Sequence, residues 1–204
     1  MNPLQRTEEW FNDRLGRFTA SSIYKLLGIK GLGETGKTYA FEKAVELVFG
    51  EVEENISTFD MQRGVELEPM AFAKFKELKE MEFIDVLECG FFKMGTSAGA
   101  SPDGLVGLDG ILEIKCPRAN TFFKLVADGK IDDKYFAQMQ MQMMATGRTK
   151  AYFFNYFVFE GKEYWHEIVI DKDEEFCEKI LNRIIEGMKI RDEYVEKLNQ
   201  NKQF

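Results

Sequence analysis

Apolar residues recur at helical spacing over roughly the first eighty residues and again near the carboxyl end, whereas the middle of the chain alternates as strands do. The predicted helices span residues 8–15, 21–27, 38–50, 59–81, 119–127, 134–146 and 173–198. The predicted strands span residues 83–92, 105–107, 111–115, 150–159 and 163–170. This order of elements predicts an α/β fold in which helices flank a central mixed sheet.

Local signals mark several boundaries of these elements. Thr7 precedes two glutamates and is the predicted N-cap of the first helix. Thr19 or Ser21 is the expected cap of the second, and Pro69 is expected to kink or break the fourth. Asp109-Gly110 predicts the tip of a hairpin between the strands at 105–107 and 111–115. This hairpin carries the most informative side chains of the chain.

Ser101-Pro102-Asp103-Gly104-Leu105 enters the hairpin, and Glu113-Ile114-Lys115 lies on its second strand. Residues two apart on a strand share a face, so Glu113 and Lys115 point together while Ile114 packs on the other face. Two carboxylates and a strand carbonyl suit a hard cation such as Mg²⁺, and the Lys115 ammonium could orient or activate an attacking water. The combination indicates metal-assisted phosphodiester hydrolysis. The alternative is an ordinary Asp-Gly turn beside a solvated strand face.

Length and composition bound the remaining possibilities. The 204 residues, 45% of them hydrophobic and including 19 Phe, predict one domain, residues 1–204. No apolar run reaches the ~20 residues that cross a bilayer, and the amino terminus lacks the apolar stretch of a signal peptide. We therefore expect no membrane association and a cytoplasmic location.

Cysteine and histidine usage excludes several enzyme classes. Cys89, Cys116 and Cys177 are scattered, with no CxxC pair, so neither a disulfide framework nor a zinc site is indicated. His166 is the single histidine and lies in a strand-like run. A Ser-His-Asp hydrolase or a His-ligated zinc enzyme is therefore disfavoured.

The net charge of −8 argues mildly against a nucleic-acid partner, since phosphate binding usually leaves a basic footprint. An enzyme on DNA can nevertheless confine its positive charge to a groove or channel. The candidates for such a lining are Arg6, Arg14, Arg17, Lys25, Lys30, Lys37, Arg63, Lys115, Arg118 and Lys124.

Five ordered blocks, covering about residues 10 to 170, resemble the lambda exonuclease and YqaJ-like viral recombinase family within the PD-(D/E)XK nuclease superfamily. The blocks are Trp10 with Arg14-Leu15-Gly16 and Thr19-Ala20-Ser21; Arg63-Gly64 with Glu68 and Ala71; Ser101 to Leu105 with Leu112 to Pro117; Tyr135 with Ala137 to Gln140 and Thr146; and the aromatic strand Ala151 to Tyr156. The resemblance implies a restriction-endonuclease-like core built on the mixed sheet.

The resemblance also implies roles for individual side chains. Asp103 and Glu113, with the carbonyl of Ile114, would hold two Mg²⁺ ions, for which Mn²⁺ can substitute, and Glu68 would assist at one of them. Lys115 would help to activate the water. No further cofactor is implied.

Two more sets of roles follow, with alternatives open. Gln138 would position the water, unless the helix phase places Gln140 there, and Glu66 could replace Glu68. The residues implied to hold the 5′-terminal phosphate are Arg14, Ser21 and Ser101. A guanidinium gives bidentate contacts to phosphate, but Arg14 could also simply pair with a carboxylate.

For the whole protein, the resemblance implies a deoxyribonuclease that is Mg²⁺-dependent and ATP-independent and digests one strand of linear double-stranded DNA from 5′ to 3′. It implies 3′ overhangs for phage-type recombination, a single-strand annealing protein as partner, and a homotrimeric ring that encircles the DNA. The expected location is a bacterial host's cytoplasm, with a phage or prophage as candidate origin.

Three other functions remain in competition. A restriction-like endonuclease shares the superfamily but needs no 5′-phosphate anchor such as Arg14. Gly31 to Thr38 matches the pattern G-x-x-x-x-G-K-[ST] of a nucleotide-binding P-loop, which requires a strand before the loop and a helix after it. No β-branched run precedes Gly31, so the segment is predicted to be a flexible basic loop. A non-catalytic DNA-binding or annealing protein is disfavoured by the intact set of Asp103, Glu113 and Lys115.

Overall fold

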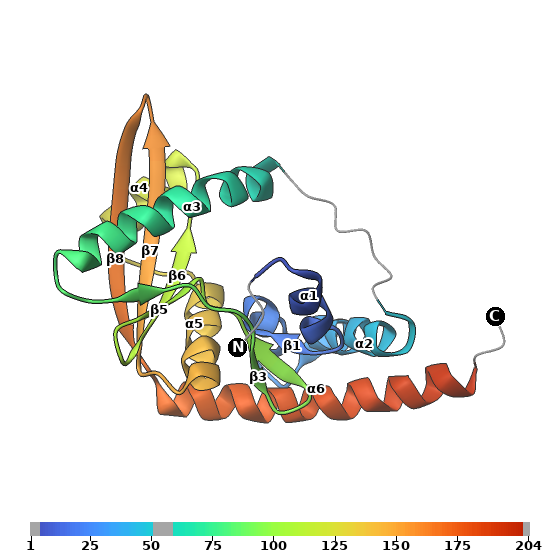
Figure 1. The fold of residues 1–204 in the computed structure, drawn as a ribbon. Helices are drawn as coiled ribbons and strands as arrows, with labels where there is room; N and C mark the ends of the chain where they lie inside the picture. The colour runs from blue at the N-terminus through green and yellow to red at the C-terminus, as the bar shows by residue number, and fades with distance from the viewer. Residues whose placement is uncertain (1–4, 51–58, 202–204) are drawn as a thin grey trace.

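The structure is a computed structural model that describes residues 5–50 and 59–201 (Figure 1). Its helices are α1 (Glu8–Arg14), the 3-10 helix η1 (Ala20–Leu26), α2 (Gly33–Phe49), α3 (Phe59–Glu80), α4 (Ala119–Asp128), α5 (Asp133–Thr146) and α6 (Glu174–Gln200). Its strands are β1 (Phe18–Thr19), β2 (Val86–Leu87), β3 (Phe92–Met94), β4 (Ala98–Ala100), β5 (Gly104–Val106), β6 (Gly110–Lys115), β7 (Lys150–Phe159) and β8 (Lys162–Asp171).

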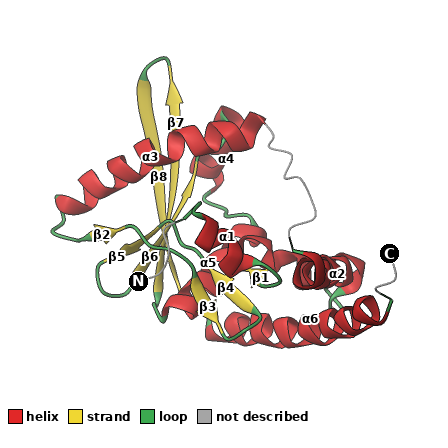
Figure 2. Ribbon diagram, turned by 45° about the vertical axis from the view of Figure 1, so that its right-hand side comes forward, coloured by secondary structure: helices red, strands yellow, loops and turns green. Residues whose placement is uncertain are grey.

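The strands form two sheets, and both are mixed. The larger sheet has the order β2-β5-β6-β7-β8, with β6 and β7 parallel and the other neighbours antiparallel. The smaller sheet has the order β1-β4-β3, with β1 parallel to β4. Figure 2 shows the two sheets on either side of α5, with α3 across the opposite face of the larger sheet. The chain passes from β4 in one sheet to β5 in the other within four residues, so this crossing point joins the two halves.

Three apolar clusters hold these layers together. On one face of the larger sheet, Ala71 and Phe75 of α3 pack with Leu112, Ile114 and other sheet residues. On the other face, Met139 and Met143 of α5 pack with Ile111, Ala151 and Phe153. The third cluster joins α5, through Ala137 and Met141, to η1, α2, β4 and α6. Helix α5 therefore lies between layers, and its residues from Ala137 to Met143 are all buried.

Most predicted elements are confirmed, including the helices near 119–127, 134–146 and 173–198 and the two long strands. Thr7 caps α1 by accepting a hydrogen bond from the Trp10 amide at 3.3 Å. The predicted hairpin is present as β5 and β6, with Val106 opposite Gly110. The β7–β8 turn has positive φ at both Glu160 and Gly161, as a two-residue hairpin turn that follows the sheet twist requires.

Several boundary predictions were wrong. The predicted strand at 83–92 is a loop interrupted by β2 and followed by β3, and the prediction missed β1 and β4. Strand β4 is Ala-Gly-Ala and lacks a strand-like pattern, because Gly99 leaves room for the Phe91 ring; a Cβ there would lie 2.2 Å from it. The Thr19 side chain makes no capping bond to η1, and α3 continues through Pro69.

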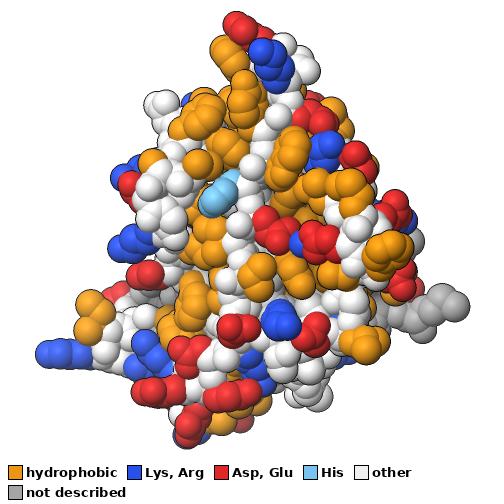
Figure 3. All heavy atoms as spheres, turned by 90° about the vertical axis from the view of Figure 1, so that its left-hand side faces the viewer, with side chains coloured by type: hydrophobic (Ala, Val, Ile, Leu, Met, Phe, Trp, Pro, Cys, Tyr) orange, Lys and Arg blue, Asp and Glu red, His pale blue; other side chains and the backbone are white. Residues whose placement is uncertain are grey.

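The outer edge of the larger sheet is β8, which carries the single histidine. His166 lies opposite Asn155 of β7 and is half-buried. Figure 3 shows apolar and charged side chains mixed on this face of the molecule. As the strand-like run predicted, His166 lies on a strand. In the described part of the chain, no helix has both the length and the apolar character needed to span a bilayer.

Candidate active site

Asp103 lies immediately before β5 and is fixed by hydrogen bonds across the hairpin. Its backbone amide donates to the Leu112 carbonyl at 2.9 Å, and its Oδ2 accepts from the Ile114 amide at 2.6 Å. The Ile114 side chain packs on the α3 face of the sheet, as the strand alternation predicted. This face is opposite that of Glu113, so the hairpin presents Asp103 and Glu113 to the same side as α5.

Glu113 is 1% exposed and is surrounded by donors. Its Oε1 accepts from Gln138 Nε2 at 2.7 Å and from Lys115 Nζ, and its Oε2 accepts from Gln142 Nε2 at 2.5 Å. A carboxylate has about four lone-pair directions. The described contacts use three of them, which leaves Oε2 as the oxygen with spare capacity.

The charges at this site perturb one another strongly. The pKa of the Asp103 carboxyl is raised well above its usual value, first by burial and then by the negative charge of Glu113, with Lys115 opposing both. Burial alone would lower the pKa of Lys115, but Glu113 and Asp103 outweigh it and raise that pKa above its usual value. Lys115 is therefore an ammonium ion that donates to Glu113, and a single cation compensates two carboxylates.

This donor set fits a hard divalent cation. Across residues 5–50 and 59–201, no group of three or more His, Cys, Asp and Glu side chains is arranged to hold a metal. The oxygens available are those of Asp103 and Glu113 and the Ile114 carbonyl, which are the ligand types that Mg²⁺ takes. Burial and the negative charge of Glu113 raise the pKa of Asp103, and a bound cation would act against both effects.

Glu68 approaches this pair from α3. Its negative charge contributes to the raised pKa of Asp103, whereas Glu66 is exposed on the same helix. Glu68 Oε2 accepts from Arg6 Nη2 at 2.8 Å in a partly exposed ion pair. Of the two glutamates considered from the sequence, Glu68 is thus the one that influences the site.

Gln138 and Gln140 of α5 lie on different faces of the helix and contact different residues. Gln138 contacts Glu113, whereas Gln140 donates to the Asp171 carbonyl at 3.0 Å and accepts from the Asp173 amide at 2.8 Å. Two residues along a helix rotate the side chain by about 200°, so Gln140 points away from the site. The predicted helix phase, with Gln138 inward, agrees with these contacts.

The sequence analysis missed Gln142, which is fully buried and contacts Glu113 directly. Gln142 could have been predicted from the sequence, because it follows Gln138 by four residues and the two therefore share a helix face. Gln142 Nε2 also lies 3.3 Å from the Ser101 carbonyl, to which it donates.

Arg14 lies at the end of α1, beside the segment that enters the hairpin. Its guanidinium carbon is 4.2 Å from the centroid of the Trp10 ring and 5.9 Å from that of Phe91. Burial lowers the pKa of Arg14, with Tyr39 and Glu46 partly opposing. Within the described residues the Arg14 side chain has neither a hydrogen bond nor an ion pair, so the alternative of a simple carboxylate partner is not observed. Its N–H groups are available to an anion.

Ser101 and Ser21 differ in whether they contact the aromatic rings that lie beside Arg14. Ser101 Oγ accepts from Trp10 Nε1 at 2.8 Å, so Ser101 contacts the ring that supports Arg14. Ser21 is exposed, and its Oγ lies 3.4 Å from Thr19 Oγ1. Because β1 pairs with β4, which leads directly into Ser101, all the predicted phosphate-binding residues lie around the crossing point between the two sheets.

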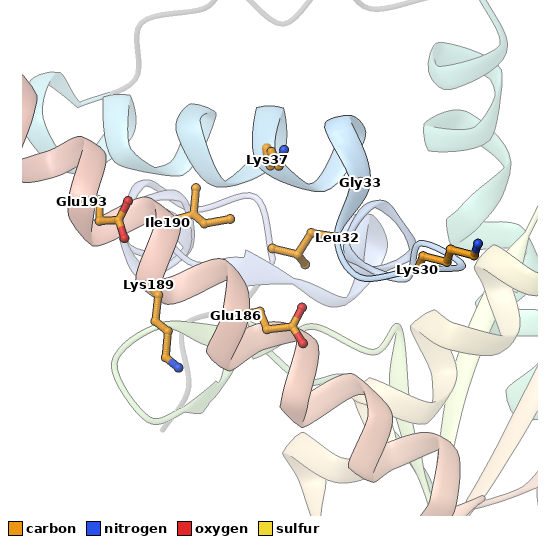
Figure 4. Close-up of a pocket in the computed structure, with 8 residues that line it drawn as sticks. All are labelled: Lys30, Leu32, Gly33, Lys37, Glu186, Lys189, Ile190 and Glu193. Carbon is orange, nitrogen blue, oxygen red and sulfur yellow. The ribbon is translucent and has the colours of Figure 1, made fainter.

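The P-loop-like segment has a different structure from a nucleotide-binding loop. Helix α2 begins at Gly33, five residues before the predicted start, so Gly36, Lys37 and Thr38 are helical, and η1 precedes the segment in place of a strand. Lys37 Nζ donates to Glu34 at 2.8 Å. A pocket of about 470 Å³ lies between the start of α2 and α6. Figure 4 shows lysines and glutamates beside apolar residues in its lining. This geometry gives no phosphate cradle and excludes a P-loop.

The candidate groove cations are only partly free. Five of the ten cations proposed from the sequence form ion pairs with acids. The pairs are Arg6 with Glu68, Lys25 with Glu42, Lys37 with Glu34, Lys115 with Glu113 and Lys124 with Asp128. Arg63 Nη2 donates to the Cys116 carbonyl at 2.5 Å and so supports the end of β6. The Arg14 side chain differs from these, because it contacts two aromatic rings and makes no hydrogen bond or ion pair within the described residues.

Comparison with known proteins places this geometry in context. The family model of the YqaJ-like viral recombinase domain matches residues 9–149. The chain is similar to an alkaline exonuclease, LHK-Exo, from Laribacter hongkongensis, with 32% identity, a TM-score of 0.82, and coverage of 95% of this chain and 97% of that one. The structure of LHK-Exo in complex with dAMP gives 33% identity, the same coverage and the same TM-score.

A more distant structure shares the fold. The phage-related exonuclease from Haemophilus somnus 129PT is 19% identical, with a TM-score of 0.74, and the match covers 89% of this chain and 96% of that one. A search among curated proteins gives no match. The structural matches confirm the predicted α/β core with mixed sheets flanked by helices, of the PD-(D/E)XK type.

Proposed function

Because the chain belongs to the YqaJ-like viral recombinase family and is a deoxyribonuclease of the phage exonuclease type, we propose a specific reaction for it. It digests one strand of linear double-stranded DNA from the 5′ end and leaves 3′ overhangs. We further propose that the reaction depends on Mg²⁺ and not on ATP. The overhangs would serve recombination by single-strand annealing.

One observation carries this proposal: an unpaired guanidinium lies beside the entry to a carboxylate pair in which Glu113 is buried and Asp103 is half-buried. The Arg14 guanidinium packs on the Trp10 ring, and Trp10 donates a hydrogen bond to Ser101. Asp103 follows Ser101 by two residues. An enzyme that cuts only at ends needs a binding site for the terminal phosphate at a fixed distance from its hydrolytic group. An endonuclease of the same fold has no such need.

Asp103 and Glu113, with the Ile114 carbonyl and with Glu68 assisting, would hold two Mg²⁺ ions, or Mn²⁺ in their place. When bound, the ions polarise the scissile phosphate and make a coordinated water a better nucleophile. Lys115, as an ammonium donor beside Glu113, would orient the water and stabilise negative charge that develops on the phosphate. Gln138 would fix Glu113 and help to position the water from the other side.

Arg14 would bind the 5′-phosphate through two parallel N–H donors, with Ser101 and Ser21 adding hydroxyl contacts. The dAMP complex of LHK-Exo supports a product of the mononucleotide class. A single-strand annealing protein is the proposed partner, and a homotrimeric ring around the duplex would confine DNA binding to an inner surface despite the net charge of −8. The proposed place of action is the cytoplasm of a bacterial host.

The test is digestion of end-labelled linear duplex with and without a 5′-phosphate, against covalently closed circles, with Mg²⁺ and without ATP. We expect loss of the 5′-ended strand, faster with the phosphate, and intact circles. Cut circles would instead identify a restriction-like endonuclease, and loss of the 3′-ended strand would reverse the proposed polarity.

A further inference from the structure

Gln142 makes two directed contacts from a position with no exposure to solvent. Its Nε2 donates to Glu113 Oε2 at 2.5 Å and to the Ser101 carbonyl at 3.3 Å, which uses both of its N–H groups. Its Oε1 is buried and accepts no hydrogen bond from the described residues. The side chain therefore joins two segments that otherwise meet only through the hairpin.

An apolar side chain of similar size would fill this space at lower cost. A buried amide oxygen without a partner carries its full desolvation penalty, which a methionine avoids. The neighbouring buried positions on α5, Met139, Met141 and Met143, show that this helix accepts methionine in its packed surroundings. The two donors are thus the property of Gln142 that the site uses.

The contacts of Ser101 extend this link to the phosphate anchor. Its carbonyl accepts from Gln142, its hydroxyl accepts from Trp10 Nε1 at 2.8 Å, and the Trp10 ring supports the Arg14 guanidinium at 4.2 Å. A continuous series of direct contacts therefore runs from Arg14 to Glu113. Each contact belongs to a packed or hydrogen-bonded pair, and chains of such pairs are one means by which energetic coupling passes between two sites.

We infer that Gln142 is a positioning residue that couples 5′-phosphate binding to the catalytic carboxylate. This inference rests on the proposed function. A phosphate held by Arg14 and Ser101 fixes the Ser101 segment, and Gln142 transmits that position to Oε2 of Glu113, the oxygen with spare lone-pair capacity. An end without a phosphate leaves the segment less fixed, and Glu113 is then held less well.

The experiment compares Gln142→Met with Gln140→Met, a matched change two residues away on the same buried helix. Gln140→Met removes hydrogen bonds to Asp171, Asp173 and Cys177, none of which involves Glu113. For each enzyme, kcat and KM are measured on linear duplex with a 5′-phosphate and with a 5′-hydroxyl, and Tm is recorded. We expect Gln142→Met to lower kcat on phosphorylated ends by about 10–100-fold, the usual effect of removing a hydrogen-bonding partner of a ligand carboxylate. KM should change little, because Arg14 still binds the end.

The decisive quantity is the ratio of kcat on the two ends. Gln142→Met should bring this ratio close to 1, whereas Gln140→Met should lower Tm and leave the ratio at its wild-type value. If Gln142→Met does not fold, Gln142→Asn, which keeps the amide but withdraws it by one methylene, should lower the ratio in the same way.

An unchanged ratio in the Gln142 variants, or an equal loss of kcat on both ends, would overturn the coupling while leaving the exonuclease function in place. A wild-type enzyme that cuts both ends at the same rate would overturn the phosphate-anchored function itself, and the coupling with it.

Discussion

The carboxylate site and the proposed phosphate anchor at Arg14 lie next to each other but are built in opposite ways. Glu113 lies on a central strand, is 1% exposed and accepts three hydrogen bonds. Arg14 lies on α1, a helix of seven residues with none buried, and its guanidinium is held by ring contacts and by no described hydrogen bond. The Glu113 carboxylate is held by donors from neighbouring side chains, whereas the N–H groups of the Arg14 guanidinium bond to no described residue.

The difference follows from what each region must bind. A buried carboxylate needs donors to be stable, and fixed donors also keep it ready for the reaction. An anchor for an external anion must keep its own donors unused, and aromatic rings can hold a guanidinium in place without consuming them. Substitutions can test each region by itself. They remove the charge beside Glu113, the two parallel N–H donors of Arg14, or the hydrogen bond between Trp10 and Ser101.

The largest effect is expected from Lys115→Ala on the carboxylate side. Loss of the ammonium beside Glu113 should lower the single-turnover cleavage rate by about 10²–10⁴-fold, the usual range for a group that assists proton transfer. Metal-dependent DNA binding, measured by fluorescence anisotropy, should remain. Lys150→Ala, which removes an exposed partner of Asp109, is the control and should cut normally. Retained turnover in Lys115→Ala would remove Lys115 from the mechanism.

On the anchor side, Arg14→Ala and Arg14→Lys should act on end preference. A hydrogen bond to a charged group contributes about 1.5–3 kcal/mol, so Arg14→Ala should lower the preference for a 5′-phosphate by about 10–100-fold in kcat/KM. Lysine keeps the charge but not the fork and should recover only part of the preference. Arg183→Ala, whose side chain pairs with Glu186 on α6, serves as the control. Full preference in Arg14→Ala would show that the phosphate binds elsewhere.

A smaller change is expected where the two regions meet. Trp10→Phe keeps a ring under Arg14 but removes the N–H that donates to Ser101. One neutral hydrogen bond contributes about 1 kcal/mol, so the phosphate preference should fall by roughly fivefold. The measurement is competition between DNA with a 5′-phosphate and DNA with a 5′-hydroxyl. A loss of preference as large as that of Arg14→Ala would show that the indole supports Arg14 by more than this one hydrogen bond.

The smallest effect is expected from Arg6→Ala. Its ion pair with Glu68 is 45% and 34% exposed on the two side chains, and such pairs contribute about 0–1 kcal/mol. Urea unfolding should therefore shift little, and the shift should shrink further at high salt. A loss above about 2 kcal/mol would mean that this contact supports α3 and the site more than an exposed pair can.

The carboxylate site was predictable because its residues are close in sequence. Asp103 and Glu113 lie on one hairpin, whose turn and strand alternation fix their shared side. The long helices and the β7–β8 pair were also predictable, because their apolar periods extend over many residues.

The remaining features depend on contacts between distant segments. Strands β1 and β4 have two and three residues, and their pairing is set by packing around Gly99 and Phe91. The Trp10–Ser101 bond joins residues 91 positions apart, and no local pattern encodes it. The P-loop-like segment shows that a local pattern can also mislead. Gly31 to Thr38 match the motif in full, but most of these residues belong to helix α2.

The position of α5 between layers also determines how the enzyme loses activity on heating. Its buried residues contact the larger sheet, η1, β4 and α6, and they include the glutamines that hold Glu113. Backbone amides in such a segment exchange with solvent mainly when the whole molecule opens. We therefore expect the catalytic geometry to be lost together with the fold, so that inactivation and global unfolding coincide on heating.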